Sequence, residues 1–107
     1  MNTVTKKDVA KRTAQEFNDN SEDMVKIHTA EKFVDAVFSA LRKILSEADP
    51  EVRIEIRDFG VFEVKKTKPK PKARNPRTGE IIYVPARRKT HFKAGKILKD
   101  ALKKDTD

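Results

Sequence analysis

Apolar residues near the start of the chain recur with a helical period, separated by polar ones. Thr5 and Asp8 have the spacing of a capping box, and apolar residues then recur at roughly helical spacing as far as Phe17. Residues 18–21 are Asn-Asp-Asn-Ser, whose side chains compete for backbone hydrogen bonds and favour turns. The pattern predicts a first helix over 5–17, followed by a loop.

A second and stronger period begins at Thr29, which we take as the N-cap, and continues to Leu45. It predicts a long amphipathic helix. Its apolar stripe is wide and includes Phe33 and Phe38, more than one short helix is expected to cover. We therefore expect this stripe to need a partner surface.

The period changes from helical to alternating after Asp49-Pro50. Residues 52–56 alternate between apolar and charged, which is typical of a strand with one buried face, and 61–66 give a second strand after a turn. Residues 81–84 resume a strand pattern, and 94–102 are again helical with lysines between the apolar positions. The order predicts an α+β fold: two N-terminal helices, a three-stranded antiparallel sheet and a short C-terminal helix.

The segment between the second and third strands, residues 67–80, is basic and contains no aromatic residue. It includes Pro69 and Pro71, which cannot donate to a ladder, and it turns at Thr78-Gly79. We interpret it as a long β-hairpin arm over about 65–86. A dozen residues at roughly 3.3 Å each span roughly 40 Å.

The net charge of +8 is unevenly distributed. Residues 1–63 contain 10 Lys/Arg and 13 Asp/Glu, a net of −3, whereas residues 64–107 contain 15 and 4, a net of +11. A field of this sign attracts a polyanion, so nucleic acid is the first candidate partner.

Several other classes of function lack the residues they need. There is no cysteine, and neither His28 nor His91 has a second ligand at metal spacing, so we assign no metal, no cofactor and no small-molecule substrate. The carboxylates form no pair suited to acid–base work, and we predict no enzymatic activity. Without a long apolar run or a signal peptide, we expect no membrane association and a cytoplasmic protein.

Three motifs carry a family resemblance. The blocks Phe59-Gly60-Val61-Phe62, Arg74-Asn75-Pro76-Arg77-Thr78-Gly79-Glu80 and Phe92-Lys93-Ala94-Gly95-Lys96 resemble the HU/IHF family of bacterial DNA-bending proteins. The resemblance spans nearly the whole chain and implies an intertwined dimer. It implies one domain over 1–107, with a helical dimerisation part at 1–48, a sheet at 49–92 and a C-terminal helix at 93–104.

The resemblance also implies roles for individual residues. Pro76 would wedge between base pairs at the arm tip, and Lys93 and Lys96 would contact phosphates from the body. The remaining arm residues expected to contact DNA are Lys65, Lys66, Lys68, Lys70, Lys72, Arg74, Asn75, Arg77, Arg87 and Arg88. The residues expected in the dimer core are Phe33, Val37, Phe38, Leu41, Phe59, Phe62 and Phe92. We expect Tyr83 to pack and not to contact DNA.

This chain departs from the family pattern at several places. The segment between Phe62 and Arg74 is one residue longer than in many members, and residues 18–28 contain about eight more than the usual link between the helices. Val4 stands where the family often has lysine, and Lys89-Thr90-His91-Phe92 replaces a common Val-Pro-x-Phe.

The function implied is an architectural protein that binds duplex DNA in the minor groove with little sequence preference, bends it and compacts the nucleoid. Two alternatives stay open at this point: a site-specific subunit of the integration-host-factor type, which would allow a heterodimer with a paralogue, and a basic ribosomal-type RNA-binding protein. A nuclease would need acidic metal ligands near the basic surface, and Glu80 and Asp100 are the only acids between 64 and 104.

Overall fold

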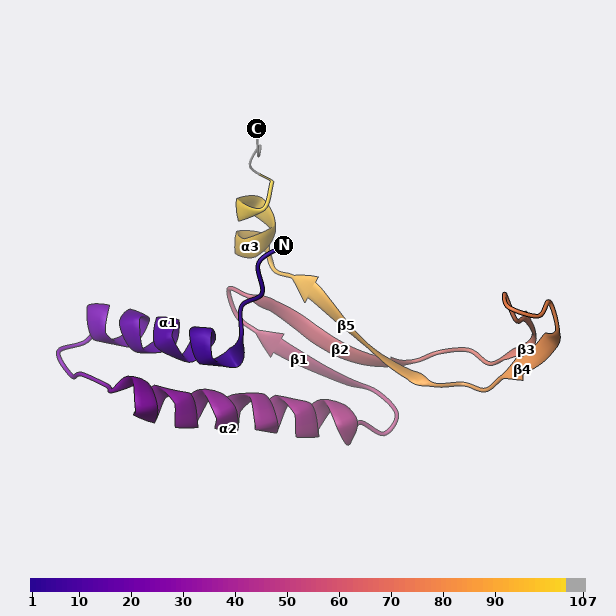
Figure 1. Ribbon diagram of the computed structural model, residues 1–107, viewed down its shortest axis with the longest axis horizontal. Coiled ribbons are helices and arrows are strands. Elements are labelled where there is room, and N and C mark those ends of the chain that lie inside the picture. The colour runs from indigo at the N-terminus through magenta and orange to yellow at the C-terminus, as the bar shows by residue number, and fades with distance from the viewer. Residues whose placement is uncertain (104–107) are drawn as a thin grey trace. The chain divides into compact units, whose positions relative to one another are not determined.

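The computed structural model describes residues 1–103, which form three helices and five strands. The chain divides into two compact units, Met1–Ile44 and Leu45–Asp107. Two helices, an antiparallel sheet and a short C-terminal helix follow in the predicted order (Figure 1). Residues 81–84, predicted as a strand, pair within the arm, and residues 88–94 form the third strand of the sheet. In residues 1–103, no helix combines the length and the apolar character required to cross a membrane.

Helix α1 (Lys6–Asp19) begins with the predicted capping box. The Thr5 side chain accepts a hydrogen bond from the Asp8 amide at 3.4 Å, and the Asp8 carboxylate accepts one from the Thr5 amide at 3.0 Å. The helix ends two residues later than predicted, because the Asn20 amide donates to the Phe17 carbonyl and the Asn20 side chain to the Glu16 carbonyl.

Helix α2 (Ile27–Ser46) begins two residues before the predicted N-cap. The Ala30 amide donates to the Lys26 carbonyl at 3.0 Å, so the first helical turn already closes at Lys26. The prediction that Thr29 is the N-cap is therefore wrong, because Thr29 lies inside the first turn.

The two helices lie side by side and bury small residues. Ala10 and Ala14 of α1 and Ala30 and Val34 of α2 are buried (Figure 1). An ion pair between Lys6 Nζ and Asp35 Oδ1 at 2.8 Å joins the first turn of α1 to α2.

The inserted segment between the helices is closed by one side chain. Asn18 Oδ1 accepts a hydrogen bond from the Val25 amide at 2.8 Å, and Asn18 Nδ2 donates to the Val25 carbonyl at 3.2 Å. These two bonds imitate a backbone bridge across the extra residues, so the insertion is tied to the end of α1.

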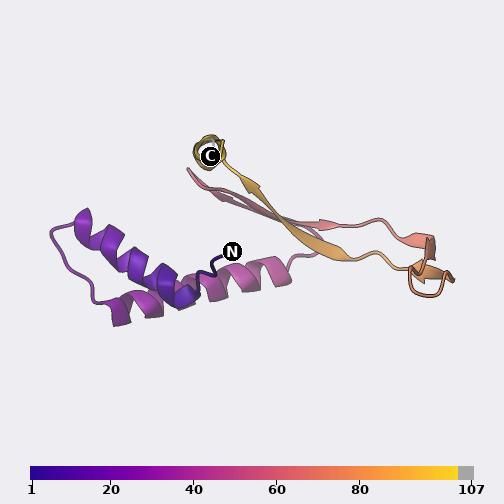
Figure 2. The ribbon, with the colours of Figure 1, turned by 45° about the horizontal axis from the view of Figure 1, so that its top comes forward.

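The second unit contains the sheet. Strands β1 (Val52–Ile56), β2 (Gly60–Lys66) and β5 (Arg88–Ala94) form an antiparallel sheet in the order β1-β2-β5. Strands β3 (Lys70–Arg74) and β4 (Ile81–Val84) form a separate hairpin between β2 and β5. Figure 2 shows β2 and β5 twisting as they leave the sheet toward this hairpin.

Helix α3 (Lys96–Ala101) follows β5 directly. Lys93 and Ala94 pair with Val61 and Gly60 of β2, so they are strand residues. The predicted helix start at 93 is wrong for this reason, and its predicted end at 104 lies outside the described residues.

The buried core is thin. Val64 is buried, and Phe62, half-buried, pairs in register with Ile54 of β1 and Phe92 of β5. Within residues 1–103, no large side chain is fully buried. A single copy of this chain therefore leaves most of its large apolar side chains partly in water.

Candidate nucleic-acid interface

The turn at the end of the arm is closed by hydrogen bonds. The Asn75 amide donates to the Glu80 carbonyl and the Gly79 amide to the Asn75 carbonyl, both at 2.7 Å. The Asn75 side chain accepts from the Arg77 amide at 2.9 Å, a common way for asparagine to shape a turn. Pro76 lies next to Asn75, and the turn thus holds it at the tip of the arm.

Gly79 supplies the backbone conformation that closes the turn. Its φ is +73°, a region that residues with a Cβ avoid, while its surroundings have room for a side chain. The requirement for glycine is therefore conformational and not steric.

The root of the arm is held by a side chain in place of a ladder. The β2–β5 ladder ends at the Lys66–Arg88 pair, and the β3–β4 ladder begins at the Lys70–Val84 pair. Between them, the Thr67 amide donates to the Arg87 carbonyl at 2.6 Å, and the Arg87 amide donates to Thr67 Oγ1 at 2.9 Å. Thr67 thereby bridges the two strands of the arm where prolines interrupt regular pairing.

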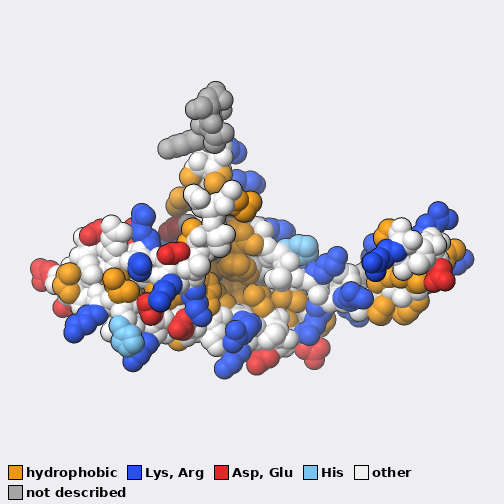
Figure 3. Space-filling view, viewed as in Figure 1, with side chains coloured by type: hydrophobic (Ala, Val, Ile, Leu, Met, Phe, Trp, Pro, Cys, Tyr) orange, Lys and Arg blue, Asp and Glu red, His pale blue; other side chains and the backbone are white. Residues whose placement is uncertain are grey.

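Most of the basic side chains predicted to bind DNA are exposed along the arm. Figure 3 shows Lys and Arg side chains on the arm's end together with a cluster of hydrophobic ones. The exposed members of the predicted set are Lys65, Lys66, Lys68, Lys70, Lys72, Arg74, Arg77, Arg87, Arg88, Lys93 and Lys96. The arm is thus a basic ribbon open to a polyanion.

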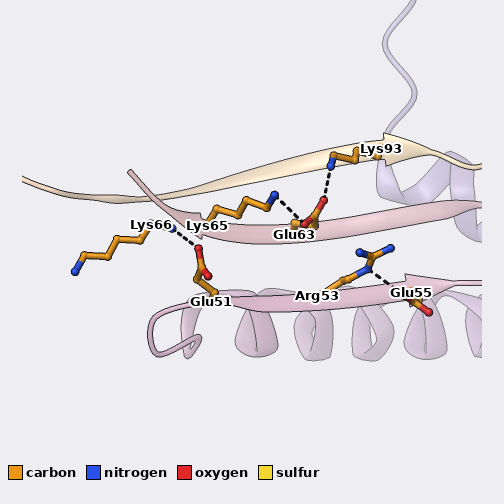
Figure 4. Close-up of polar contacts among 7 residues, drawn as sticks. All are labelled: Glu51, Arg53, Glu55, Glu63, Lys65, Lys66 and Lys93. Carbon is orange, nitrogen blue, oxygen red and sulfur yellow. Dashed lines mark hydrogen bonds and ion pairs between the residues drawn. The ribbon is translucent and has the colours of Figure 1, made fainter. Parts of the chain in front are cut away.

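Arg88 and Lys66 of the predicted set make contacts that hold the root of the arm. Arg88 Nη1 donates to the carbonyls of Ser46, the last residue of α2, and Ala48, which lies between α2 and β1. The Lys66 amide donates to the Glu51 carboxylate at 3.1 Å (Figure 4). Both contacts fasten the root of the arm to the segment before β1.

A buried carboxylate lies on the outer face of the sheet. Glu63 is only 6 % exposed, and its oxygens contact Lys93 Nζ at 3.0 Å and Lys65 Nζ at 3.5 Å (Figure 4). The hydrogen bond from Lys93 lowers the pKa of the Glu63 carboxyl below its ordinary value, outweighing the opposing effect of burial, and the charges of both lysines add to the lowering. Glu63 therefore brings together two of the predicted DNA-contacting lysines.

A cluster of aromatic rings lies on the opposite face. Phe62 and Phe92 have ring centroids 4.8 Å apart, and Phe59 lies 5.3 Å from Phe92. Gly60 makes this packing possible, because an added Cβ would come within 2.5 Å of the Lys93 carbonyl and 2.7 Å of the Phe92 ring.

The predicted dimer-core residues are incompletely covered within one chain. Phe33 is 68 % exposed, while Leu41 and Phe62 are half-buried. The other exposed members are Val37, Phe38, Phe59 and Phe92. Their burial between two chains stays a prediction.

Sequence reasoning was wrong on Tyr83 and missed three residues. Tyr83 is 64 % exposed, so the expected packing does not occur within residues 1–103. The missed residues are Glu51, Glu63 and Thr67, which hold the arm root and the two lysines. Glu63 could have been noticed as an acid two residues before a basic run. The bond of Glu51 to a distant backbone amide leaves no comparable local pattern.

No cluster of three or more His, Cys, Asp or Glu side chains suited to a metal ion occurs in the part of the chain that the structure describes. The surface features that stand out are instead a basic ribbon with a proline at its tip and a small sheet with lysines on its outer face. These define a class: a small α+β protein that presents a basic β-arm.

Comparisons with known proteins identify the family. The family described as "Bacterial DNA-binding protein" matches residues 4–103, and the chain belongs to it. It is 43 % identical over 74 residues to DNA-binding protein HU of Geobacillus stearothermophilus, covering 69 % of this chain and 78 % of that protein. It is 41 % identical over 73 residues to integration host factor subunit alpha of Buchnera aphidicola, covering 68 % of each.

The fold has a counterpart among solved structures. A chain from a cocrystal structure of Anabaena HU with DNA matches with a TM-score of 0.71 and 24 % sequence identity, covering 94 % of this chain and 98 % of that one. The predicted α+β fold with a three-stranded sheet and a β-hairpin arm is thereby confirmed.

Proposed function

We infer that this protein is an architectural DNA-binding protein that acts as a homodimer. It binds duplex DNA in the minor groove with little sequence preference, bends the duplex and compacts the nucleoid, and it has no catalytic role. The observation that carries this inference is the hydrogen-bonded turn that holds Pro76 at the end of an exposed basic arm in a chain of this family.

The chemistry of the arm suits this function. Lysine and arginine side chains neutralise phosphates without reading bases, so they give affinity that depends little on sequence. A proline ring has no amide hydrogen to leave unpaired, and inserting an apolar wedge between base pairs costs a few kcal/mol per step. Contacts of the arm and of Lys93 and Lys96 along the bent duplex offset this cost.

The role of Pro76 can be tested with a matched proline. Pro76→Ala is expected to reduce the bend angle strongly while lowering affinity by less than about tenfold, because the phosphate contacts remain. Pro85→Ala, in the same arm but away from the tip, is expected to retain the bend. Fluorescence energy transfer across an end-labelled duplex measures both quantities, and an unbent duplex at saturation with the unmodified protein would contradict the proposed function.

The similarity to integration host factor subunit alpha supports a second candidate, a site-specific DNA-bending subunit. A site-specific protein binds its site typically 10³-fold or more tightly than random duplex. Competition of genomic fragments against a random duplex at one salt concentration separates the two. We expect a narrow spread of affinities, and one fragment bound more than a hundredfold more tightly than the rest would favour the second candidate.

A further inference from the structure

Strand β4 exposes apolar side chains on both faces of the arm. Ile81 is 67 % exposed, Ile82 40 % and Tyr83 64 %. Successive strand residues point to opposite faces, so Ile81 and Tyr83 share one face, while Ile82 lies on the other with Ala73, its partner on β3. We refer to Ile81 and Tyr83 as the outer apolar pair.

The ribbon offers this pair no cover of its own. Arg74 is opposite Ile81 in the register, and β3 and β4 form a sheet of two strands only. Figure 3 shows hydrophobic side chains gathered on one side of the arm's end, beside Lys and Arg side chains. Burying apolar side chains of this size lowers the free energy, so a surface from another molecule would cover them favourably.

The charge of the arm indicates which surface this is. Between residues 65 and 88 the arm has nine Lys or Arg residues and one acid, Glu80. A second arm of the same charge would be repelled, whereas a polyanion would be attracted. The occupant must therefore combine negative charge with apolar walls. The DNA minor groove does so, because phosphates line its rims and the C–H faces of deoxyribose form its walls.

We propose that Ile81 and Tyr83 form an apolar contact with the deoxyribose wall of the minor groove, separate from the wedge at Pro76. This proposal rests on the proposed function and adds a component of affinity that does not depend on phosphate charge. Contacts to phosphates set the slope of log Kd against log salt, at about 0.9 per phosphate, while apolar contacts appear in the affinity extrapolated to 1 M salt.

The two components can be separated by a salt titration. The double variant Ile81→Ser, Tyr83→Ser is expected to lose about tenfold to a hundredfold in affinity at 1 M salt with an unchanged slope. Lys72→Ala on the neighbouring strand is the opposite control, since it is expected to lower the slope by about 0.9. Tyr83→Phe retains the ring and is expected to retain the extrapolated affinity.

The controls distinguish this proposal from its alternatives. Thermal unfolding of the double serine variant is expected to match that of the parent, since both side chains are exposed. An unchanged extrapolated affinity would overturn the proposal. So would assemblies larger than a dimer in sedimentation of the DNA-free parent that disappear in the variant, because the pair would then join protein arms. Failure of the parent to bind duplex at all would instead contradict the proposed function.

Discussion

At the scale of single residues, two glycines are required for different reasons. Gly60 has no room for a Cβ, because the Lys93 carbonyl and the Phe92 ring come within 2.7 Å of its position. Gly79 has open space around it but a φ of +73°. A sequence pattern marks both as turn residues, whereas only the structure separates steric from conformational need.

Replacing each glycine by alanine is expected to affect different properties. Gly60→Ala forces β2 and β5 apart and should lower the free energy of unfolding by about 1–3 kcal/mol. Gly79→Ala strains only the arm tip, by about 1–2 kcal/mol, and should reduce DNA bending more than global stability. Urea unfolding followed by circular dichroism measures the first effect, and equal loss of global stability in both variants would contradict this assignment.

Glu63 provides a pH-dependent contribution to stability. Its pKa is lower in the folded chain than the ordinary value of 4.5, so its contribution is present above about pH 4.5 and is lost as pH falls through the folded value. We expect Glu63→Gln to be less stable than the parent at pH 7, with a difference that shrinks toward pH 3. Glu80→Gln at the arm tip removes the same charge and serves as the control in urea unfolding at each pH. A difference independent of pH would exclude this role.

At the scale of elements, the arm root connects the β2–β5 ladder to the β3–β4 ladder, and the two are not continuous. Pro69 and Pro71 make an interruption predictable from the sequence, because they cannot donate to a ladder. The role of Thr67 is not predictable, since its hydroxyl accepts from Arg87, twenty residues away. The Thr67 hydroxyl thus links the two strands of the root at the gap between the ladders.

Removing that hydroxyl is expected to loosen the joint without unfolding the sheet. Thr67→Val retains the shape of the side chain and should cost about 0.5–1.5 kcal/mol locally. Hydrogen exchange at the Arg87 amide should speed up about threefold to tenfold, while amides of β1 stay unchanged. Thr78→Val, which removes an acceptor at the tip only, is the matched control. Unchanged exchange at Arg87 in Thr67→Val would show that the hydroxyl does not hold the joint.

Local patterns predicted most elements but not all their ends. The capping box at Thr5 and Asp8 and the alternation over 52–56 are local signals, and both elements form as predicted. The starts of α2 and α3 differ from the predicted ones because they depend on where backbone hydrogen bonds form. The first turn of α2 closes at Lys26. Lys93 and Ala94 pair with β2, so α3 begins after them. The Glu63 contacts depend on two strands meeting, which a sequence pattern does not specify.

At the scale of the whole molecule, the thin core indicates association. The described residues contain no large, fully buried side chain, and Phe33 is 68 % exposed although it lies on the apolar stripe of α2. A folded chain with so much apolar surface in water gains stability by covering that surface with a second copy. Stability and association are then expected to rise together with protein concentration.

Placing a charge on this stripe is expected to weaken the dimer. Phe33→Glu should raise the dimer dissociation constant about tenfold or more, because an ionised carboxylate resists burial between two chains. Lys32→Glu, on the neighbouring exposed residue, is expected to leave the dimer nearly unchanged. Sedimentation equilibrium over a range of concentrations measures both, and a dimer unaffected by Phe33→Glu would place the interface elsewhere.

The alternation of lysine and proline through Lys68-Pro69-Lys70-Pro71 has a consequence for crowded conditions. A ribbon of two strands has free edges on both sides, and such edges are templates for another strand to add. Along this edge, Pro69 and Pro71 offer no amide hydrogen, and the lysines between them repel a similar neighbour. Many copies packed along one stretch of chromosome should therefore not merge into β-aggregates through this edge.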